Sequence, residues 1–153
     1  MARRLRCYMG PPLRPFATSA GLPIFAGLVR HGEVEQGEIR HALRIGVPMT
    51  RRAWVYPARH ASSKLHDPAL PAMGQRLRLR SSVKPNRFPP QARVIVRALK
   101  RYGALVADHG ASEIHLTGAP SAEWNMSQIF ELSRLRAQDF EAVDTGSLPR
   151  PSP

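Results

Sequence analysis

The residues best suited to acid–base chemistry stand together in the segment Arg59-His60-Ala-Ser-Ser. The guanidinium of Arg59 disfavours a second positive charge beside it, so we expect His60 to be neutral and available as a base or hydrogen-bond donor. With one of the two serine hydroxyls and the carboxylate of Asp67, His60 could form a nucleophilic triad. The serines lack a Gly-x-Ser-x-Gly elbow, and proximity in sequence does not give triad geometry. His60 is therefore the one candidate catalytic residue.

Two residues elsewhere in the chain could bind a ligand. Asp108 follows an apolar run, and its carboxylate could bind a cation or accept hydrogen bonds from sugar hydroxyls. The competing interpretation is a turn in which this side chain bonds its own backbone. Trp124 could stack on a sugar ring, although a large apolar residue just before a helix often packs against that helix instead. The candidate ligand-binding residues are therefore Arg59, His60, Asp108 and Trp124.

The six histidines do not form a metal-binding pattern. His60 and His66 are six positions apart, as are His109 and His115, and neither spacing places two ligands on one face of a helix. The single Cys7 excludes an internal disulfide and a multi-cysteine metal site. A glycine-rich phosphate loop is also missing. We therefore predict no metal and no cofactor, and the sequence leaves open whether the protein is an enzyme.

The strongest compositional feature is a formal net charge of +12, and 20 of the 23 basic residues are arginine. Residues 75–83 alternate, with Arg76, Arg78 and Arg80 on one side, and this face is the candidate polyanion-binding surface. The competing interpretation is an ordinary solvated face, because aromatic residues are not interleaved with these arginines. No run of about 18 apolar residues predicts a membrane span, and the basic start of the chain lacks the apolar region of a signal peptide.

The clearest structural element is an amphipathic helix at residues 91–102. It follows two prolines, its apolar residues recur at steps of three and four, and Gly103 follows in the position of a helix-ending glycine. Two short apolar runs come next, at residues 104–107 and 114–116, and they predict a β-hairpin.

Weaker patterns complete the expected fold. Asn125 can cap a short second helix. The remaining expected elements are strands at residues 39–47, 51–56, 75–83 and 140–143, and a long loop at 58–74. We predict an antiparallel-rich α+β fold, with an incomplete sandwich-like sheet, one main helix and one short helix. The expected organisation is a disordered basic leader at 1–19, a single domain at 20–145 and a disordered tail at 146–153.

An ordered series of motifs carries a family resemblance from about Leu13 to Leu148. The motifs are AGLPIFAGLVR from Ala20, GEIRHALR from Gly37, YPARH from Tyr56, PAMG from Pro71, FPPQA from Phe88, ALKRYG from Ala98, AD at Ala107, GAP from Gly118 with Trp124, and DFEAVD from Asp139. The series resembles the C-terminal half of a family of secreted bacterial proteins of unassigned function. In that family a signal peptide and a further half with more strands precede this region, so the chain resembles a truncated member whose domain is part of a larger one.

Two positions depart from the family pattern. His109 stands where members usually have asparagine before the glycine, and Ile114-His115 stands where they usually have an aromatic residue. The resemblance implies secretion, whereas the chain as given shows no signal peptide and would be expected in the cytoplasm. It brings no known catalytic residue with it.

Three functions follow from these patterns. The first is a fragment or remnant of a secreted protein that binds or processes extracellular polysaccharide, which rests on the resemblance and Trp124. The second is a basic nucleic-acid-binding protein, which rests on the charge. The third is a hydrolase that depends on His60.

Overall fold

A computed structural model describes residues 4–9 and 18–144, in which six strands form one mixed sheet. The spatial order is β1-β5-β2-β4-β3-β6. The pairs β1–β5 and β2–β4 are parallel, and the other three pairs are antiparallel. The strands are β1 (Leu5–Tyr8), β2 (Leu43–Val47), β3 (Arg76–Leu79), β4 (Ala104–His109), β5 (Ile114–Thr117) and β6 (Phe140–Ala142). The α+β class is confirmed, but the expected antiparallel, sandwich-like sheet is wrong, because the described strands form a single mixed sheet.

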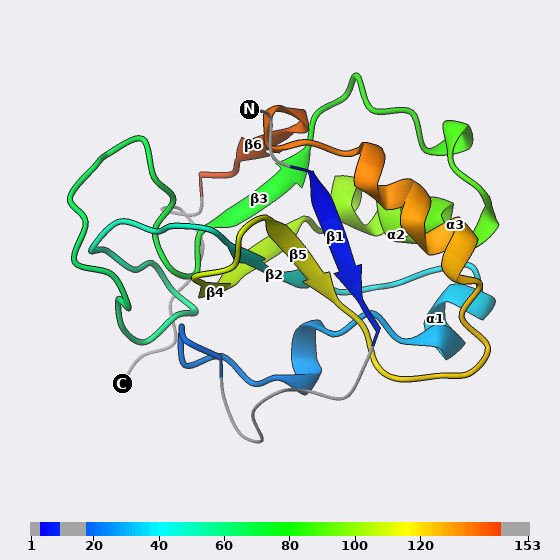
Figure 1. Cartoon of the computed structure of the whole chain (residues 1–153), viewed down its shortest axis with the longest axis horizontal. Helices are drawn as coiled ribbons and strands as arrows, with labels where there is room; N and C mark the ends of the chain where they lie inside the picture. Colours follow the sequence, from blue (N-terminus) through cyan, green and yellow to red (C-terminus); the bar gives the residue numbers. More distant parts are fainter. Residues whose placement is uncertain (1–3, 10–17, 145–153) are drawn as a thin grey trace.

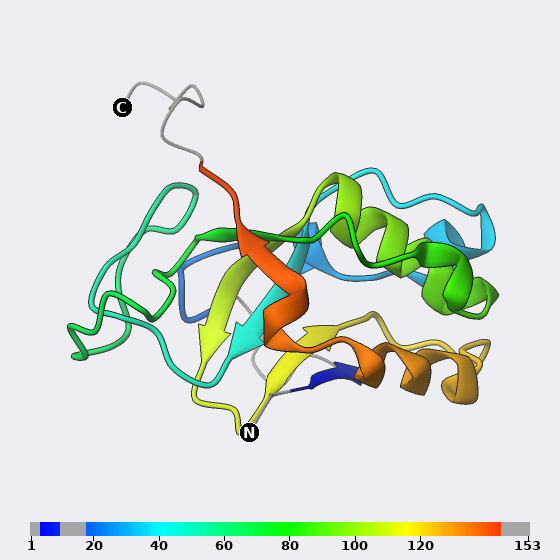
Figure 2. The ribbon, with the colours of Figure 1, turned by 90° about the horizontal axis from the view of Figure 1, so that it is seen from above.

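The sheet curls until its two edges approach each other (Figures 1 and 2). Arg4, just before β1, forms an isolated antiparallel bridge with Arg136, which shortly precedes β6. The backbone N–H of Leu5 also donates to the carbonyl of Leu135 at 2.8 Å. These contacts satisfy backbone groups that an open edge strand would leave unpaired.

The helices gather at one end of the curled sheet (Figure 1). The main helix, α2 (Pro90–Arg101), confirms the predicted helix to within one residue at each end. Gly103 follows it with φ +70°, a left-handed conformation that glycine adopts at little cost, and its N–H donates to the carbonyl of Ala98 at 3.2 Å. The other helical elements are η1 (Phe25–Gly27), α1 (His31–Glu35), η2 (Pro85–Arg87), α3 (Met126–Phe130), η3 (Glu131–Arg134) and η4 (Ala137–Asp139).

The predicted cap of the second helix is confirmed. The side-chain oxygen of Asn125 accepts a hydrogen bond from the N–H of Gln128 at 3.2 Å, which satisfies one of the donors at the start of α3. The core lies between these helices and the sheet. It includes side chains at most 1% exposed from β2, α2, β5, α3 and η3: Leu43, Ile45, Ile95, Leu99, Leu116, Ile129 and Leu132. Each such burial stabilises the fold by about 1.5–3 kcal/mol.

The predicted hairpin is wrong, because β2 lies between β4 and β5. All five residues of β2 are buried, as expected for a central strand with neighbours on both sides. β4 and β5 are close in sequence, but each completes its hydrogen bonds with β2 instead of with the other. Short-range sequence patterns do not contain this long-range pairing.

The leader predicted to be disordered contains β1. Leu5 is fully buried and pairs with Ile114 of β5, so a long-range contact orders a segment whose neighbouring prolines suggest disorder. The rest of the expected leader before residue 18, apart from Arg4 and Met9, lies outside the described residues, and so does the expected tail.

Residues 48–74 form a lobe at the end of the sheet opposite the helices (Figures 1 and 2). The predicted strand at 51–56 is reduced to one parallel bridge between Trp54 and Met73. The predicted loop at 58–74 has no regular helix or strand, as expected. Backbone hydrogen bonds hold the lobe: Val55 N–H donates to the Met73 carbonyl at 2.8 Å, and Gly74 N–H donates to the Val106 carbonyl of β4 at 2.8 Å.

Candidate functional site

Three polar side chains, Arg44, Asp108 and His115, meet at the middle of β2, and we call them the sheet-centre cluster. Gly46 is paired with Asp108 of β4 on one side and with His115 of β5 on the other. The register of β2 and β4 shifts between Ile45 and Gly46, and such an irregularity changes the direction in which the next side chain points. Strand pairing thus assembles a guanidinium, a carboxylate and an imidazole from three strands.

Gly46 makes room for this cluster. A Cβ atom built on Gly46 would lie 1.8 Å from Cε1 of His115 and 2.3 Å from Nε2. The imidazole therefore lies directly over the Gly46 backbone, where a side chain of any kind would collide with it. A glycine inside a strand often marks such a close approach.

Arg44 is buried, with 9% of its surface exposed. Its Nη1 lies 3.5 Å from Oδ2 of Asp108, while its Nε is buried without a hydrogen-bond partner among the described residues. Burial lowers the pKa of Arg44, and the Asp108 charge opposes that shift. Breaking such a pair by removing one partner is costly, because the other charge is left buried and uncompensated.

Asp108 also holds a distant loop in place. Its Oδ1 accepts a hydrogen bond from the backbone N–H of Ser19 at 2.7 Å. The turn interpretation, in which this carboxylate bonds its own neighbouring backbone, therefore does not describe its main contact. Asp108 serves Arg44 and Ser19 together, which leaves it less free to bind a cation or sugar.

Burial lowers the pKa of His115, and the positive charge of Arg44 acts in the same direction. The carboxylate of Asp108 and a backbone hydrogen bond at Glu113 oppose this shift without reversing it. His115 is consequently neutral at pH 7, and it is a better candidate for a general base than the exposed His60. The sequence predicted such a neutral histidine at position 60 instead.

The structure does not assemble the triad considered for His60. His60 and Arg59 are exposed on the lobe, and His60 has no hydrogen-bond partner among the described residues. The hydroxyl of Ser62 donates to the backbone carbonyl of Ser19, while Asp67 accepts from the N–H of Ala69 at 2.9 Å. The hydroxyl and the carboxylate are therefore both used in holding loops.

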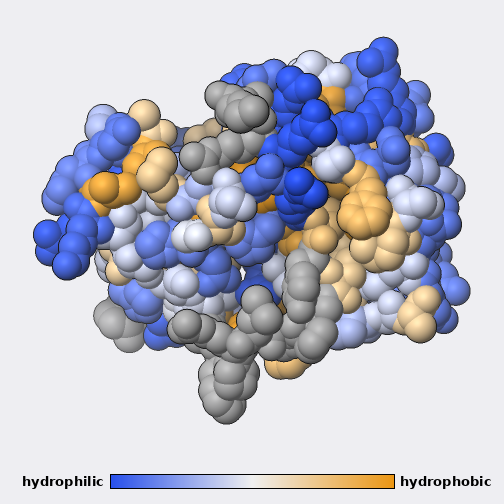
Figure 3. Space-filling model, viewed as in Figure 1, coloured by the Kyte–Doolittle hydropathy of each residue, from blue (hydrophilic) through white to orange (hydrophobic). Residues whose placement is uncertain are grey.

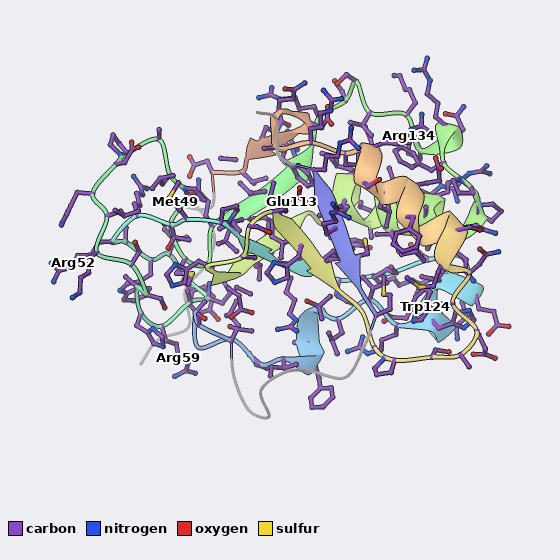
Figure 4. The ribbon with its side chains drawn as sticks, in the orientation of Figure 1. Met49, Arg52, Arg59, Glu113, Trp124 and Arg134 are labelled. Atoms are coloured by element: carbon purple, nitrogen blue, oxygen red, sulfur yellow. The ribbon has the colours of Figure 1, made fainter. Side chains whose placement is uncertain are left out.

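Trp124 lies apart from Arg59, at the helical end of the molecule (Figure 4). It is 7% exposed, and its Nε1–H donates to the carbonyl of Ala119 at 2.8 Å. Its ring meets the ring of His31 edge to face, with 5.0 Å between centroids. These contacts fit the packing interpretation and leave little of the indole surface for a ligand.

The arginines of β3 form a partly neutralised surface. Nε of Arg78 donates to Oε1 of Glu141 on β6 at 2.7 Å, and Nη1 of Arg80 lies 3.6 Å from Oε2 of the same carboxylate. Arg76 is half-buried, and its Nε is buried without a partner among the described residues. The local positive field is therefore weaker than three exposed arginines would produce.

A surface that the sequence did not single out lies on the lobe. Arg52, Trp54 and Tyr56 are exposed at alternate positions, with Trp54 51% and Tyr56 47% accessible, and we call them the aromatic–arginine stripe. The intervening residues are half-buried. Arg52 points outward from the lobe, and Arg59 lies on the same lobe (Figure 4). Figure 3 shows that the lobe is edged by hydrophilic side chains around a small hydrophobic area. The sequence signal was the alternation itself, which indicated a strand but not its exposed side.

The described residues contain no group of three or more His, Cys, Asp or Glu side chains that could hold a metal ion. They also include no helix with the length and apolar character needed to cross a membrane. Comparison with protein-family models, curated proteins and solved structures finds no match to this chain. The candidate sites therefore rest on their own geometry.

Proposed function

We propose that the protein binds an acidic polysaccharide through the aromatic–arginine stripe, as a piece of a secreted bacterial protein. The exposure of Trp54 and Tyr56 beside Arg52 carries this proposal. Large aromatic side chains usually bury most of their surface, so two that remain about half accessible in one short segment indicate a binding surface. The series of family motifs supports the secreted origin.

The chemistry of the stripe suits a chain of charged sugars. Indole and phenol rings offer flat apolar faces to the C–H groups of a sugar ring, while their polar tips stay hydrated. The guanidinium groups of Arg52 and Arg59 can pair with uronate carboxylates, and arginine makes such contacts in bidentate form. A net charge of +12 adds a long-range attraction for any polyanion.

The backbone holds the stripe in place before any ligand arrives. Val55 donates to Met73, and Met73 donates back to the carbonyl of Ala53 at 3.1 Å. Gly74 packs so closely against this segment that a Cβ atom there would lie 2.1 Å from the carbonyl oxygen of Val55. A surface fixed in this way loses less conformational entropy on binding than a mobile loop.

Single-stranded nucleic acid is the second candidate ligand. It is favoured by the same combination of exposed aromatic and arginine side chains together with the charge of +12, because bases stack on such rings while phosphates pair with the cations. A duplex offers no free base faces, so the stripe favours single strands over double strands.

Calorimetric titration with four polymers tests the proposal: alginate oligomers, neutral dextran, oligo-dT and duplex DNA. We expect alginate to bind most tightly of the four polymers. Trp54→Ala should lower the affinity for alginate about tenfold, which is the effect of losing one ring that stacks on the indole. Phe130→Ala is the matched control, since Phe130 is an aromatic residue 60% exposed on α3 at the other end of the molecule. Equal losses in both variants, or no alginate binding, would refute the proposal. Tighter binding of oligo-dT would select the second candidate.

A further inference from the structure

A separate apolar pocket of about 510 Å³ lies where the curled sheet meets the lobe. Val47, Leu77 and Phe140 line it from β2, β3 and β6, and Leu70 lines it from the lobe. This volume lies within the range of small-molecule sites, which are typically concave, mostly apolar and supplied with a few polar groups. The helices lie at the other end of the curled sheet (Figure 2).

One positively charged side chain lies among these apolar lining residues. The only charged residue among the described residues that line the pocket is Arg51, and the only other polar residue with a long side chain is Gln75. The backbone N–H of Arg51 donates to the carbonyl of Pro71 at 3.0 Å, which fixes the residue against the lobe. Its Nε, however, is buried and has no hydrogen-bond partner among the described residues.

A buried N–H of an arginine that has no acceptor destabilises the folded protein, and an anion bound beside the guanidinium would supply that acceptor. Arg51 makes no ion pair with an acidic residue among those described, so no described carboxylate neutralises its guanidinium. By contrast, Arg78 and Arg80 share a carboxylate. The pocket thus combines an apolar volume with one unsatisfied cation.

We propose that this pocket binds a small amphipathic carboxylate, such as a medium-chain fatty acid. Its hydrocarbon tail would lie against Leu70, Leu77 and Phe140, and its carboxylate would pair with the guanidinium of Arg51. One arginine matches the single charge of a carboxylate. This site is independent of the aromatic–arginine stripe, because Arg51 lines the pocket and Arg52 is exposed on the outer side of the same segment.

The neighbouring arginines provide a matched test. Decanoate and 1-decanol are titrated calorimetrically into the full chain and into Arg51→Gln and Arg52→Gln. We expect Arg51→Gln to weaken decanoate binding about tenfold, the effect of losing one charge-assisted contact, and Arg52→Gln to leave it unchanged. The weaker binding of 1-decanol should be the same in all three proteins, because an alcohol does not need the cation.

A second variant locates the ligand. Leu70→Trp places a large ring in the pocket and should abolish binding of both compounds, while circular dichroism verifies that each variant remains folded. Decanoate binding that survives Leu70→Trp, equal losses in the two arginine variants, or no decanoate binding to the unaltered chain would each overturn the proposal.

Discussion

The sheet-centre cluster and the aromatic–arginine stripe use similar residue types in opposite environments. In the cluster, Arg44 is buried, and its position depends on strands brought together from distant parts of the chain. In the stripe, Arg52 is exposed, and its companions are its near neighbours in sequence. The polar residues of the cluster therefore hold the fold together, whereas the stripe residues are free to contact a ligand. Substitutions in the cluster should therefore change stability, and substitutions in the stripe should change binding.

Gly46→Ala should have the largest effect. The added Cβ would overlap the His115 ring at 1.8 Å, so the ring must leave its place over the Gly46 backbone. Overpacking of this kind costs about 1–3 kcal/mol, which urea denaturation would show as a lower midpoint. The double variant Gly46→Ala with His115→Ala should recover part of this loss. If the double variant is as unstable as the sum of both changes, the ring does not lie over Gly46.

His115 should make stability depend on pH. Its pKa in the folded protein lies below the ordinary value of 6.5, so the unfolded chain binds this proton first as pH falls. The free energy of unfolding should thus be highest above pH 6.5, decrease as pH falls toward the folded pKa, and become constant below it with respect to this group. Unfolding measured at several pH values checks this.

His115→Phe should remove that component of the pH dependence while keeping a ring over Gly46. The exposed His66 provides the control, because His66→Phe should leave the acid-sensitive component in place. An unaltered pH profile in His115→Phe would show that other groups cause the sensitivity.

The double change Trp54→Ala with Tyr56→Ala should hardly affect stability. Both side chains are about half exposed, and surface substitutions usually change the free energy of unfolding by no more than about 0.5 kcal/mol. Alginate affinity should nevertheless fall further than in Trp54→Ala alone. A stability loss as large as that of Gly46→Ala would mean that the two rings pack into the fold, and the contrast between the two regions would disappear.

Glu141→Gln should likewise have only a small effect on stability. It removes the carboxylate that Arg78 and Arg80 share, and exposed ion pairs of this kind contribute about 0.2–1 kcal/mol. Alginate affinity should change little, because the stripe is on the lobe. Gel retardation of oligo-dT at low salt provides a second measurement. If Glu141→Gln strongly increases oligo-dT binding while Trp54→Ala has no effect on it, the polyanion-binding surface lies on β3 and not on the lobe.

The parts of the fold that depend on neighbours in sequence could be predicted, and the parts that depend on distant pairing could not. α2 and the Asn125 cap follow from periodicity and local hydrogen bonding. The hairpin prediction failed because β2 separates β4 from β5. β1 was missed because its partner is far along the chain.

The same distinction applies to the sites. Asp108 was found from its position at a strand end, but Arg44 was not singled out, and His115 was noted only for its spacing from His109 and as a departure from a family pattern. A usable signal was present, since strand alternation places Arg44 and Gly46 on one face, and a glycine inside a strand indicates that another group comes close. The identity of that group required the pairing of β2 with β5. The exposed side of the stripe likewise depends on how the lobe docks.

The closure of the curled sheet also determines how the chain can fold. Arg6 and Glu113 form an ion pair although they are 107 positions apart in the sequence. The backbone N–H of Leu5 finds its acceptor only when the carbonyl of the distant Leu135 has come into place. Contacts between such distant residues slow folding, because a long loop must close before any of them forms. On a ribosome, β1 would emerge long before its partner β5 and stay unpaired until β5 has been synthesised. During that interval β1 is open to pairing with another chain.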